Sequence, residues 1–292
     1  MRWLVALLLV VPLTGCAALA ADDDGRVHVT AGFYPLVWVA ERVGGRYVDV
    51  TGLTDPGVEP HDIEPTFART VALARADLVV IERGLQPAID EAVAQNAEGR
   101  VLDASSVVRG TPFARQLDGE LDPHLWLDPV NMALIGDLVA HDLSELDPPH
   151  AAAYQRNADA LRADLERLDG DFAAGLSDCE RSTIVTSHDA FGYWAKYGIE
   201  VAPVAGLTPD AEPTPAGIAR LQQLIRDDGI TTVFSERLAS PELTSSLARD
   251  LGLRTEVLDP VEGLTSEDAE ENYLSLMREN LTALEEANGC TP

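Results

Sequence analysis

Short runs of β-branched and aliphatic residues, each followed by a longer helical pattern, recur along this chain of 292 residues. Such alternation is typical of βαβ units, in which the strands are parallel and helices cover the sheet. Eight runs fall into two groups of four, at residues 27–30, 48–51, 78–81 and around Val101, and then at residues 183–186, 200–204, 232–235 and 255–258. We therefore predict an α/β protein of two lobes, each a four-stranded, mainly parallel sheet flanked by helices.

One long helical pattern separates the two groups. Within residues 149–176, apolar side chains recur at three-, four- and seven-residue spacing among charged ones, at Tyr154, Leu161, Leu165, Leu168 and Phe172. An ordinary surface helix would show the same pattern, but its length and its place between two similar halves favour a rigid backbone helix. The predicted division is a leader at residues 1–20, an N-terminal lobe at 21–148, the linking helix at 149–178 and a C-terminal lobe at 179–292.

The N-terminus resembles an export signal. Residues 3–13 form an apolar run that is too short to cross a bilayer but has the length of a signal-peptide core. Two processing sites compete: residues 13–16 resemble a bacterial lipobox that would place a lipid on Cys16, whereas residues 18–20 fit ordinary cleavage after Ala20. We favour the lipobox, which predicts a lipoprotein on the outer side of the cytoplasmic membrane; ordinary cleavage predicts a periplasmic protein.

The net charge of −28 narrows the choice of partners. A strongly acidic surface repels nucleic acid and anionic lipid and attracts cations, so we predict no nucleic-acid partner. Lys196 is the only lysine, and the chain contains neither a Gly-Lys-Ser/Thr phosphate loop nor a Gly-x-Gly, Gly-x-Ser-x-Gly, His-Glu-x-x-His or Cys-x-x-Cys motif. The common enzyme signatures are therefore absent. Cys179 and Cys290 remain after processing, either as a disulfide that closes the C-terminal half or as two unpaired thiols.

Three histidines and one aspartate follow predicted strands or lie in the long loops beside them. Parallel sheets present ligand sites at the carboxyl ends of their strands. His61 lies in the loop after the second strand, His188 follows the strand at residues 183–186, and Asp259 follows the last strand; His124 lies at the end of the long loop that includes residues 104–123. If the lobes face each other, these four side chains converge in the cleft between them. We interpret the remaining histidines as structural or solvated: His28, His141 and His150.

The chemistry of this ligand set, three imidazoles and one carboxylate, indicates which metal ion the site would bind. This set of three nitrogens and one oxygen suits Zn²⁺, whereas Ca²⁺ and Mg²⁺ prefer oxygen ligands and Mn²⁺ would prefer a second carboxylate. Glu59, Asp62 and Glu64 lie near His61, where they either accept hydrogen bonds from ligating imidazoles or merely solvate a surface loop. A zinc hydrolase is the competing class, but a fourth protein ligand would close the position that activates water. We therefore predict a binding protein and not an enzyme.

Three motifs carry a resemblance to a known family. They are Gly-x-Glu-Pro-His-x-x-Glu-Pro-Thr at residues 57–66, Asp-Pro-His-x-Trp-Leu-Asp-Pro at 122–129 and Ser-His-Asp-Ala-Phe-Gly-Tyr at 187–193. In this order they resemble the zinc-binding substrate-binding proteins of ABC-type metal importers. The resemblance implies two lobes joined by a backbone helix, Zn(II) as the transported ligand, and delivery by a monomer to an ABC permease driven by a cytoplasmic ATPase. Position by position, it implies the metal ligands His61, His124, His188 and Asp259.

One feature departs from the family. Many zinc-binding members carry a His-rich loop before the second metal histidine, whereas residues 104–123 contain no histidine. The protein then loads zinc directly or accepts it from a separate metallochaperone. Two alternatives within the same fold stay open, a manganese-binding importer component and a surface adhesin, although manganese-binding relatives usually carry Glu in place of His188.

Overall fold

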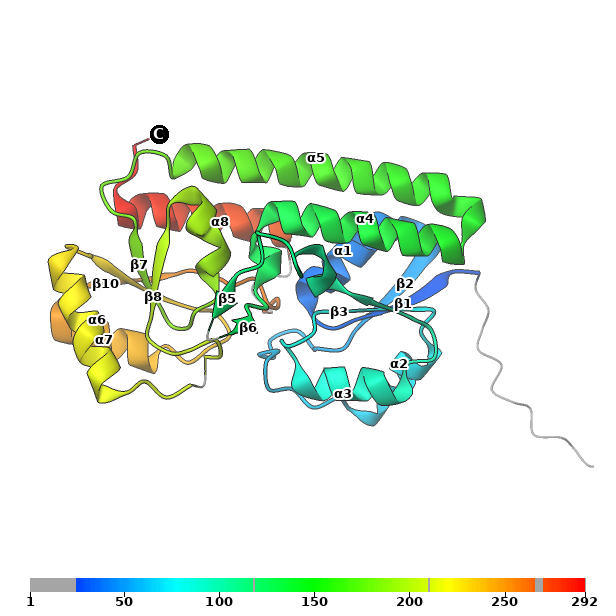
Figure 1. The fold of residues 1–292 in the computed structure, drawn as a ribbon, viewed down its shortest axis with the longest axis horizontal. Helices are drawn as coiled ribbons and strands as arrows, with labels where there is room; N and C mark the ends of the chain where they lie inside the picture. The colour runs from blue at the N-terminus through cyan, green and yellow to red at the C-terminus, as the bar shows by residue number, and fades with distance from the viewer. Residues whose placement is uncertain (1–24, 118, 210, 266–269, 292) are drawn as a thin grey trace, which may run out of the picture.

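Two parallel four-stranded sheets lie side by side beneath a long helix (Figure 1). The structure, a computed structural model, describes residues 25–117, 119–209, 211–265 and 270–291. The predicted leader and lipidation site, residues 1–20 with Cys16, lie outside the described residues. Within the described ranges, no helix combines the length and the apolar character that a membrane span requires.

The N-terminal sheet has the strand order β2-β1-β3-β4, with every pair parallel. Its strands are β1 (Val27–Ala31), β2 (Val48–Gly52), β3 (Leu78–Ile81) and β4 (Arg100–Asp103). The helical elements of this half are α1 (Tyr34–Gly44), η1 (Gly45–Tyr47), α2 (Phe67–Arg75), α3 (Pro87–Asn96), η2 (Ala104–Val107), η3 (Leu125–Leu127) and α4 (Pro129–Leu146). All four residues of β3 are buried, because helices cover both faces of this central strand.

The C-terminal sheet has the order β10-β9-β7-β8 and is also parallel throughout. Its strands are β7 (Thr183–Thr186), β8 (Glu200–Pro203), β9 (Thr232–Ser235) and β10 (Arg254–Val257). The helical elements of this half are η5 (Phe191–Tyr197), α6 (Pro215–Asp227), α7 (Glu242–Leu251) and α8 (Tyr273–Asn288). All eight predicted strands are present, so the predicted fold class is confirmed.

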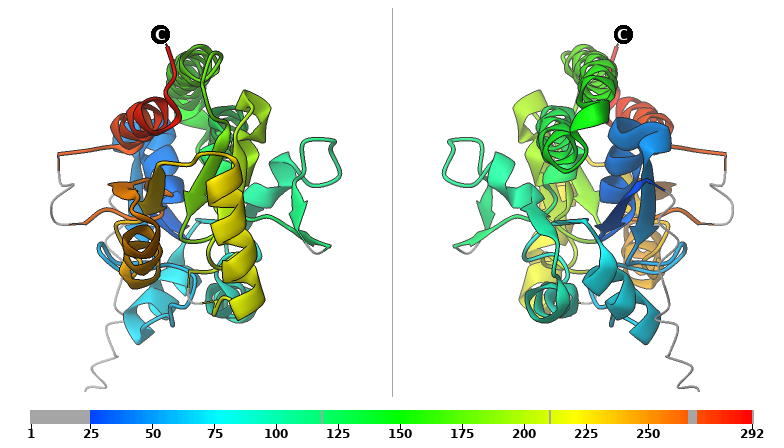
Figure 2. Two further views of the ribbon diagram at one scale, coloured as in Figure 1. Left: turned by 90° about the vertical axis from the view of Figure 1, so that its left-hand side faces the viewer. Right: turned by 90° about the vertical axis from the view of Figure 1, so that its right-hand side faces the viewer.

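A small hairpin interrupts the stretch at residues 104–123 that the sequence predicts to be a loop. Its antiparallel strands are β5 (Gln116–Leu117) and β6 (Glu120–Leu121). Two-residue strands are too short to produce an alternating pattern, which explains why the sequence does not reveal them. In Figure 2 the segment that carries this hairpin stands out from the side of the body.

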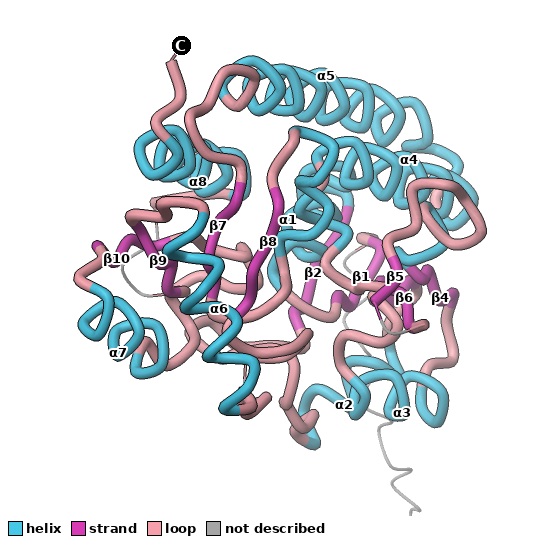
Figure 3. Tube along the Cα trace, turned by 60° about the vertical axis from the view of Figure 1, so that its left-hand side comes forward, coloured by secondary structure: helices cyan, strands magenta, loops and turns pink. Residues whose placement is uncertain are grey.

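The predicted backbone helix is confirmed as α5 (Ala151–Gly175), which follows the short turn η4 (Pro148–His150). Six side chains of one face are buried at alternating four- and three-residue spacing: Tyr154, Ala158, Leu161, Leu165, Leu168 and Phe172. This face packs against α1 and α4 of the N-terminal half and against α8 of the C-terminal half (Figure 3). Gly136 of α4 allows the close approach, since a Cβ there would lie 2.9 Å from a methyl group of Leu161.

One hydrophobic core continues from the first half into the second along α5. Two smaller cores lie apart from it, one against β3 and α3 and one against β9 and α6. The ring of Trp38 on α1 stacks on that of Tyr273 on α8, with centroids 4.9 Å apart, so the last helix also touches the first half. The halves are therefore joined by packed helices rather than by a flexible linker. The lobe boundaries at residues 148 and 179 stay a prediction.

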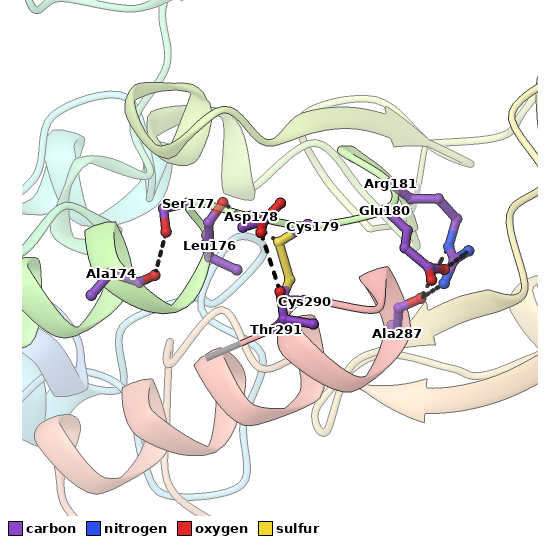
Figure 4. Close-up of a disulfide and its surroundings, with 10 residues drawn as sticks. All are labelled: Ala174, Leu176, Ser177, Asp178, Cys179, Glu180, Arg181, Ala287, Cys290 and Thr291. Carbon is purple, nitrogen blue, oxygen red and sulfur yellow. Dashed lines mark hydrogen bonds and ion pairs between the residues drawn. A yellow bond between two sulfur atoms is a disulfide. The ribbon is translucent and has the colours of Figure 1, made fainter.

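A disulfide joins Cys179 to Cys290, which selects one of the two states that the sequence leaves open. It connects the segment before β7 to the residues after α8 (Figure 4). Hydrogen bonds beside it join the same two segments, with Thr291 N donating to Asp178 O at 3.0 Å and the Arg181 guanidinium donating to Ala287 O. The end of α8 is thus tied to the segment that connects α5 to β7.

We expect the disulfide to contribute measurably to stability. Replacing both cysteines (Cys179→Ala with Cys290→Ala) should lower the free energy of unfolding by about 2–4 kcal/mol, because the bond closes a loop that spans 111 residues. Urea unfolding followed by circular dichroism measures the change. Dithiothreitol should lower the unfolding midpoint of the wild-type protein and leave that of the double variant unaltered. Equal midpoints for the oxidised wild type and the double variant would contradict the prediction.

Candidate metal centre

Three imidazoles and one carboxylate meet between the two halves. His61 comes from the loop between β2 and α2, His124 from the turn before η3, His188 from the loop after β7, and Glu262 from the loop after β10. All four side chains are buried, with 4% or less of each residue exposed. The sequence-predicted histidines of both lobes are therefore brought together, and a glutamate completes the group.

The four side chains point single atoms at a common centre. The Nε2 atoms of His124 and His188 are 3.2 Å apart, and Glu262 Oε1 lies 3.3 Å from His61 Nε2. The same carboxylate oxygen is 3.7 Å from the Nε2 atoms of both His124 and His188. All four atoms lie within 4.8 Å of one another. A zinc ion bound at about 2.0–2.1 Å in a tetrahedron holds its ligand atoms about 3.3–3.4 Å apart, so the group has the dimensions of such a site.

Two further carboxylates orient the rings. Asp122 Oδ1 accepts a hydrogen bond from His124 Nδ1 at 2.8 Å, and Glu236 Oε1 accepts one from His188 Nδ1 at 2.7 Å. A proton held on Nδ1 leaves the Nε2 lone pair free to face the centre, which is how metal-ligating histidines are usually held. The sequence predicts neither of these two contacts; the Asp-x-His spacing in the motif at residues 122–129 is the signal that could have indicated Asp122.

The predicted fourth position needs a correction, because the structure places Asp259 outside the group. Its carboxylate forms an ion pair with Arg237 at 3.0 Å and accepts a hydrogen bond from Val261 N at 2.8 Å. Val261 has a φ of 58°, a left-handed conformation that is unusual for a β-branched residue. By accepting the hydrogen bond from Val261 N, Asp259 stabilises the turn that directs the Glu262 side chain toward the histidines. Both carboxylates stand in one loop, and the sequence contains no signal that selects the second over the first.

Pairing among these groups works against the effect of burial on their pKa values. Burial opposes the charged form of His188, but the hydrogen bond and charge of Glu236 raise its pKa to about 9. For His61, burial lowers the pKa, but the hydrogen bond and charge of Glu262 raise it by more, so the net pKa is raised. Burial dominates for His124 and lowers its pKa. For Glu262, burial favours the neutral acid, yet the hydrogen bond from His61 and the charges of the three imidazoles lower its pKa to about 2. The centre thus holds a carboxylate and protons that a cation can replace.

Two tryptophan side chains form hydrogen bonds between the halves, and one of them packs beside the centre. Trp126 is buried, its ring lies 5.3 Å from that of His124, and its Nε1 donates to Pro260 O at 2.7 Å. Trp194 Nε1 donates to Leu127 O at 2.8 Å. Each of these bonds joins a segment of the first half to one of the second, so the two tryptophans hold the halves together.

A second group of candidate ligands lies on the surface of α4, where His141 is near Asp142 and Glu145. The guanidinium of Arg100 binds both of these carboxylates, at 2.7 Å and 2.6 Å. The guanidinium already neutralises both carboxylates, so this surface group is a weaker candidate for a metal site than the buried one. The ring of His28 lies beside Asp49 and that of His150 beside Asp147, and the backbone N of His28 donates to Asp77 Oδ2.

Comparison with known proteins identifies the family. Residues 29–287 match the family described as "Zinc-uptake complex component A periplasmic", which is known as ZnuA. The chain belongs to the ZnuA family. This match covers both halves and all four residues of the buried centre, so the resemblance drawn from the three motifs is confirmed.

Named members of the ZnuA family are similar over most of this chain. The zinc-binding lipoprotein AdcA of Streptococcus pneumoniae is 31% identical over 90% of this chain, which spans 56% of the length of AdcA. The high-affinity zinc uptake system protein ZnuA of Bacillus subtilis is 30% identical, with 92% of this chain and 90% of that protein covered.

Solved structures agree with these matches. The Zn(II)-bound structure of Streptococcus pneumoniae AdcA superposes with a TM-score of 0.78 at 31% identity, covering 90% of this chain and 58% of AdcA. The laminin-binding protein Lmb of Streptococcus agalactiae, described as bifunctional with adhesin and metal-transporting activity, gives a TM-score of 0.81 at 27% identity, covering 89% of this chain and 99% of Lmb.

Proposed function

We propose that this chain binds Zn(II) outside the cytoplasm and delivers it to an ABC-type importer. The observation that carries the proposal is the convergence of three Nε2 atoms and Glu262 Oε1: four of the separations are 3.2–3.7 Å, and all four atoms lie within 4.8 Å of one another. Three nitrogens and one oxygen at these spacings suit tetrahedral zinc, and Mn²⁺ would prefer more oxygen ligands. The ligands are His61, His124 and His188 with Glu262, in place of the Asp259 that the sequence predicts.

Zinc is the cargo of this site and not a catalyst. Four protein ligands fill a tetrahedral shell, so no open position remains where a bound water could be activated. The burial of all four residues also keeps a substrate molecule from reaching the metal. The protein therefore acts by binding and release, without turnover.

Delivery requires partners in the membrane. The family description, a periplasmic component of a zinc-uptake complex, supports an ABC permease with a cytoplasmic ATPase as the receiver. A lipid on Cys16 would keep the protein beside that permease. Cells that lack the gene should fail to grow under zinc limitation and recover when zinc is added. Growth that does not depend on the gene would favour the adhesin alternative.

The choice between Glu262 and Asp259 can be tested directly. Glu262→Gln should lower the affinity for zinc by at least about 100-fold, because it removes the anionic ligand from a buried site. Asp259→Asn is the matched control: it retains an oxygen that accepts from Val261 N, so the affinity should change by less than about tenfold. Competition with a chromophoric chelator measures both. The reverse order would assign the fourth ligand to Asp259.

Zinc affinity should fall as the pH falls. With its pKa raised to about 9, His188 is protonated in the metal-free protein at neutral pH. Zinc needs the neutral imidazole, so at least one proton leaves for each zinc that binds. Between about pH 7.5 and about pH 5.5, the dissociation constant should rise at least about tenfold per pH unit. Calorimetry in buffers of different ionisation enthalpy counts the protons released. Undiminished affinity at the lower pH would count against ligation by histidine.

A further inference from the structure

Arg115 connects two carboxylates that come from opposite halves of the protein. It lies directly before β5, and its guanidinium forms ion pairs with Asp122 and with Asp189. The Nη2 atom donates to both oxygens of Asp189, at 3.0 Å and 3.2 Å, while Nη1 donates to Asp122. The Asp122 side chain is fully buried and that of Asp189 is 8% exposed, whereas that of Arg115 is 25% exposed, so the guanidinium lies between the two carboxylates and solvent.

Each carboxylate is directly linked to a proposed zinc ligand. Asp122 accepts hydrogen bonds from the backbone N of His124 at 3.0 Å and from its ring Nδ1 at 2.8 Å. Asp189 follows His188 in the chain, and its own backbone N donates to Gly206 O at 2.9 Å. Arg115 is therefore linked through one intervening residue to a proposed ligand in each half: through Asp122 to His124, and through Asp189 to His188.

The surroundings are shaped to hold this side chain. A Cβ at Gly192 would lie 2.0 Å from the Arg115 guanidinium carbon, so the glycine leaves the space that the fork occupies. Tyr193 OH donates to Asp122 O at 3.0 Å from the same turn. The fork geometry of arginine allows two carboxylates to be bound at once, which a lysine ammonium does less well.

One of the two ion pairs lies within the first half of the protein, and the other joins the two halves. Asp122 and Arg115 lie on the two sides of the hairpin and are also joined by a hydrogen bond from Asp122 N to Arg115 O at 3.0 Å. They stay together if the halves move. Asp189 belongs to the opposite half, so separating the halves separates Asp189 from Arg115.

We propose that Arg115 is a positioning residue that holds the two halves closed on the metal and so slows the release of zinc. The proposal rests on the zinc site proposed above. Through Asp122 the guanidinium keeps the His124 ring oriented, and through Asp189 it holds the loop of His188 against the hairpin. Release of the cargo then requires the bond to Asp189 to break.

The test compares zinc release from four variants with that from the wild type. Arg115→Gln and Asp189→Asn should each raise the dissociation rate of zinc by about tenfold, measured by stopped-flow transfer to an excess of chelator. The double variant should release zinc no faster than Arg115→Gln, because both substitutions remove the same contact, the ion pair between Arg115 and Asp189. Arg162→Gln, which removes an ion pair with Asp137 far from the site, is the control and should release zinc at the wild-type rate.

Melting temperatures separate positioning from a general effect on stability. Arg115→Gln removes the guanidinium paired with the buried Asp122, which then keeps its hydrogen bonds from His124, so this variant changes two contacts at once. Asp189→Asn keeps the pair between Arg115 and Asp122 and tests the contact between the halves by itself. In Asp189→Asn, the rise in melting temperature on adding zinc should shrink while the melting temperature of the metal-free protein stays near that of the wild type. A release rate equal to that of Arg162→Gln, or rates that multiply in the double variant, would overturn the proposal and leave the zinc site standing. A wild-type protein that binds no zinc would overturn both.

Discussion

A carboxylate that is 2% exposed must be matched by positive charge, and Glu262 obtains that charge from the three imidazoles around it. Removing an ion from water costs several kcal/mol, so the carboxylate could not be held there without them. In the metal-free protein the hydrogen bond and charge of His61 act most strongly on Glu262, followed by the charges of His188 and His124; in the proposed function the charge comes from zinc. The same electrostatic requirement therefore assembles the site before the metal arrives and releases protons when it binds.

Such a centre also needs a frame that holds groups from distant parts of the chain to within a few tenths of an ångström. The packed face of α5 provides it, because one hydrophobic core runs along this helix through both halves. Near the site, hydrogen bonds from Trp126 and Trp194 and an ion pair from Arg115 add to this core, to which both tryptophans also belong. The two halves are therefore held by apolar packing along α5 and by additional polar contacts beside the site.

Much of the architecture follows from local patterns. β3 and β7 are continuous buried runs, and the buried face of α5 repeats at helical spacing, so both are visible in the sequence. The two-residue strands of the β5–β6 hairpin are not, because no periodicity exists over two residues. The partner of Cys179 was also open, since spacing alone cannot tell whether two thiols meet.

The sequence by itself determined the fold class, the long helix and three of the four groups in the centre, because hydrophobic periodicity and motif spacing are local properties. Only the tertiary structure places Glu262, and not Asp259, beside the three histidines, since the two residues lie in one loop and differ in the direction that the turn at Val261 gives them. It likewise decided that Glu236 and Arg115 belong to the surroundings of the site. Orientation of a side chain depends on contacts between segments far apart in the chain, and no local pattern encodes those contacts.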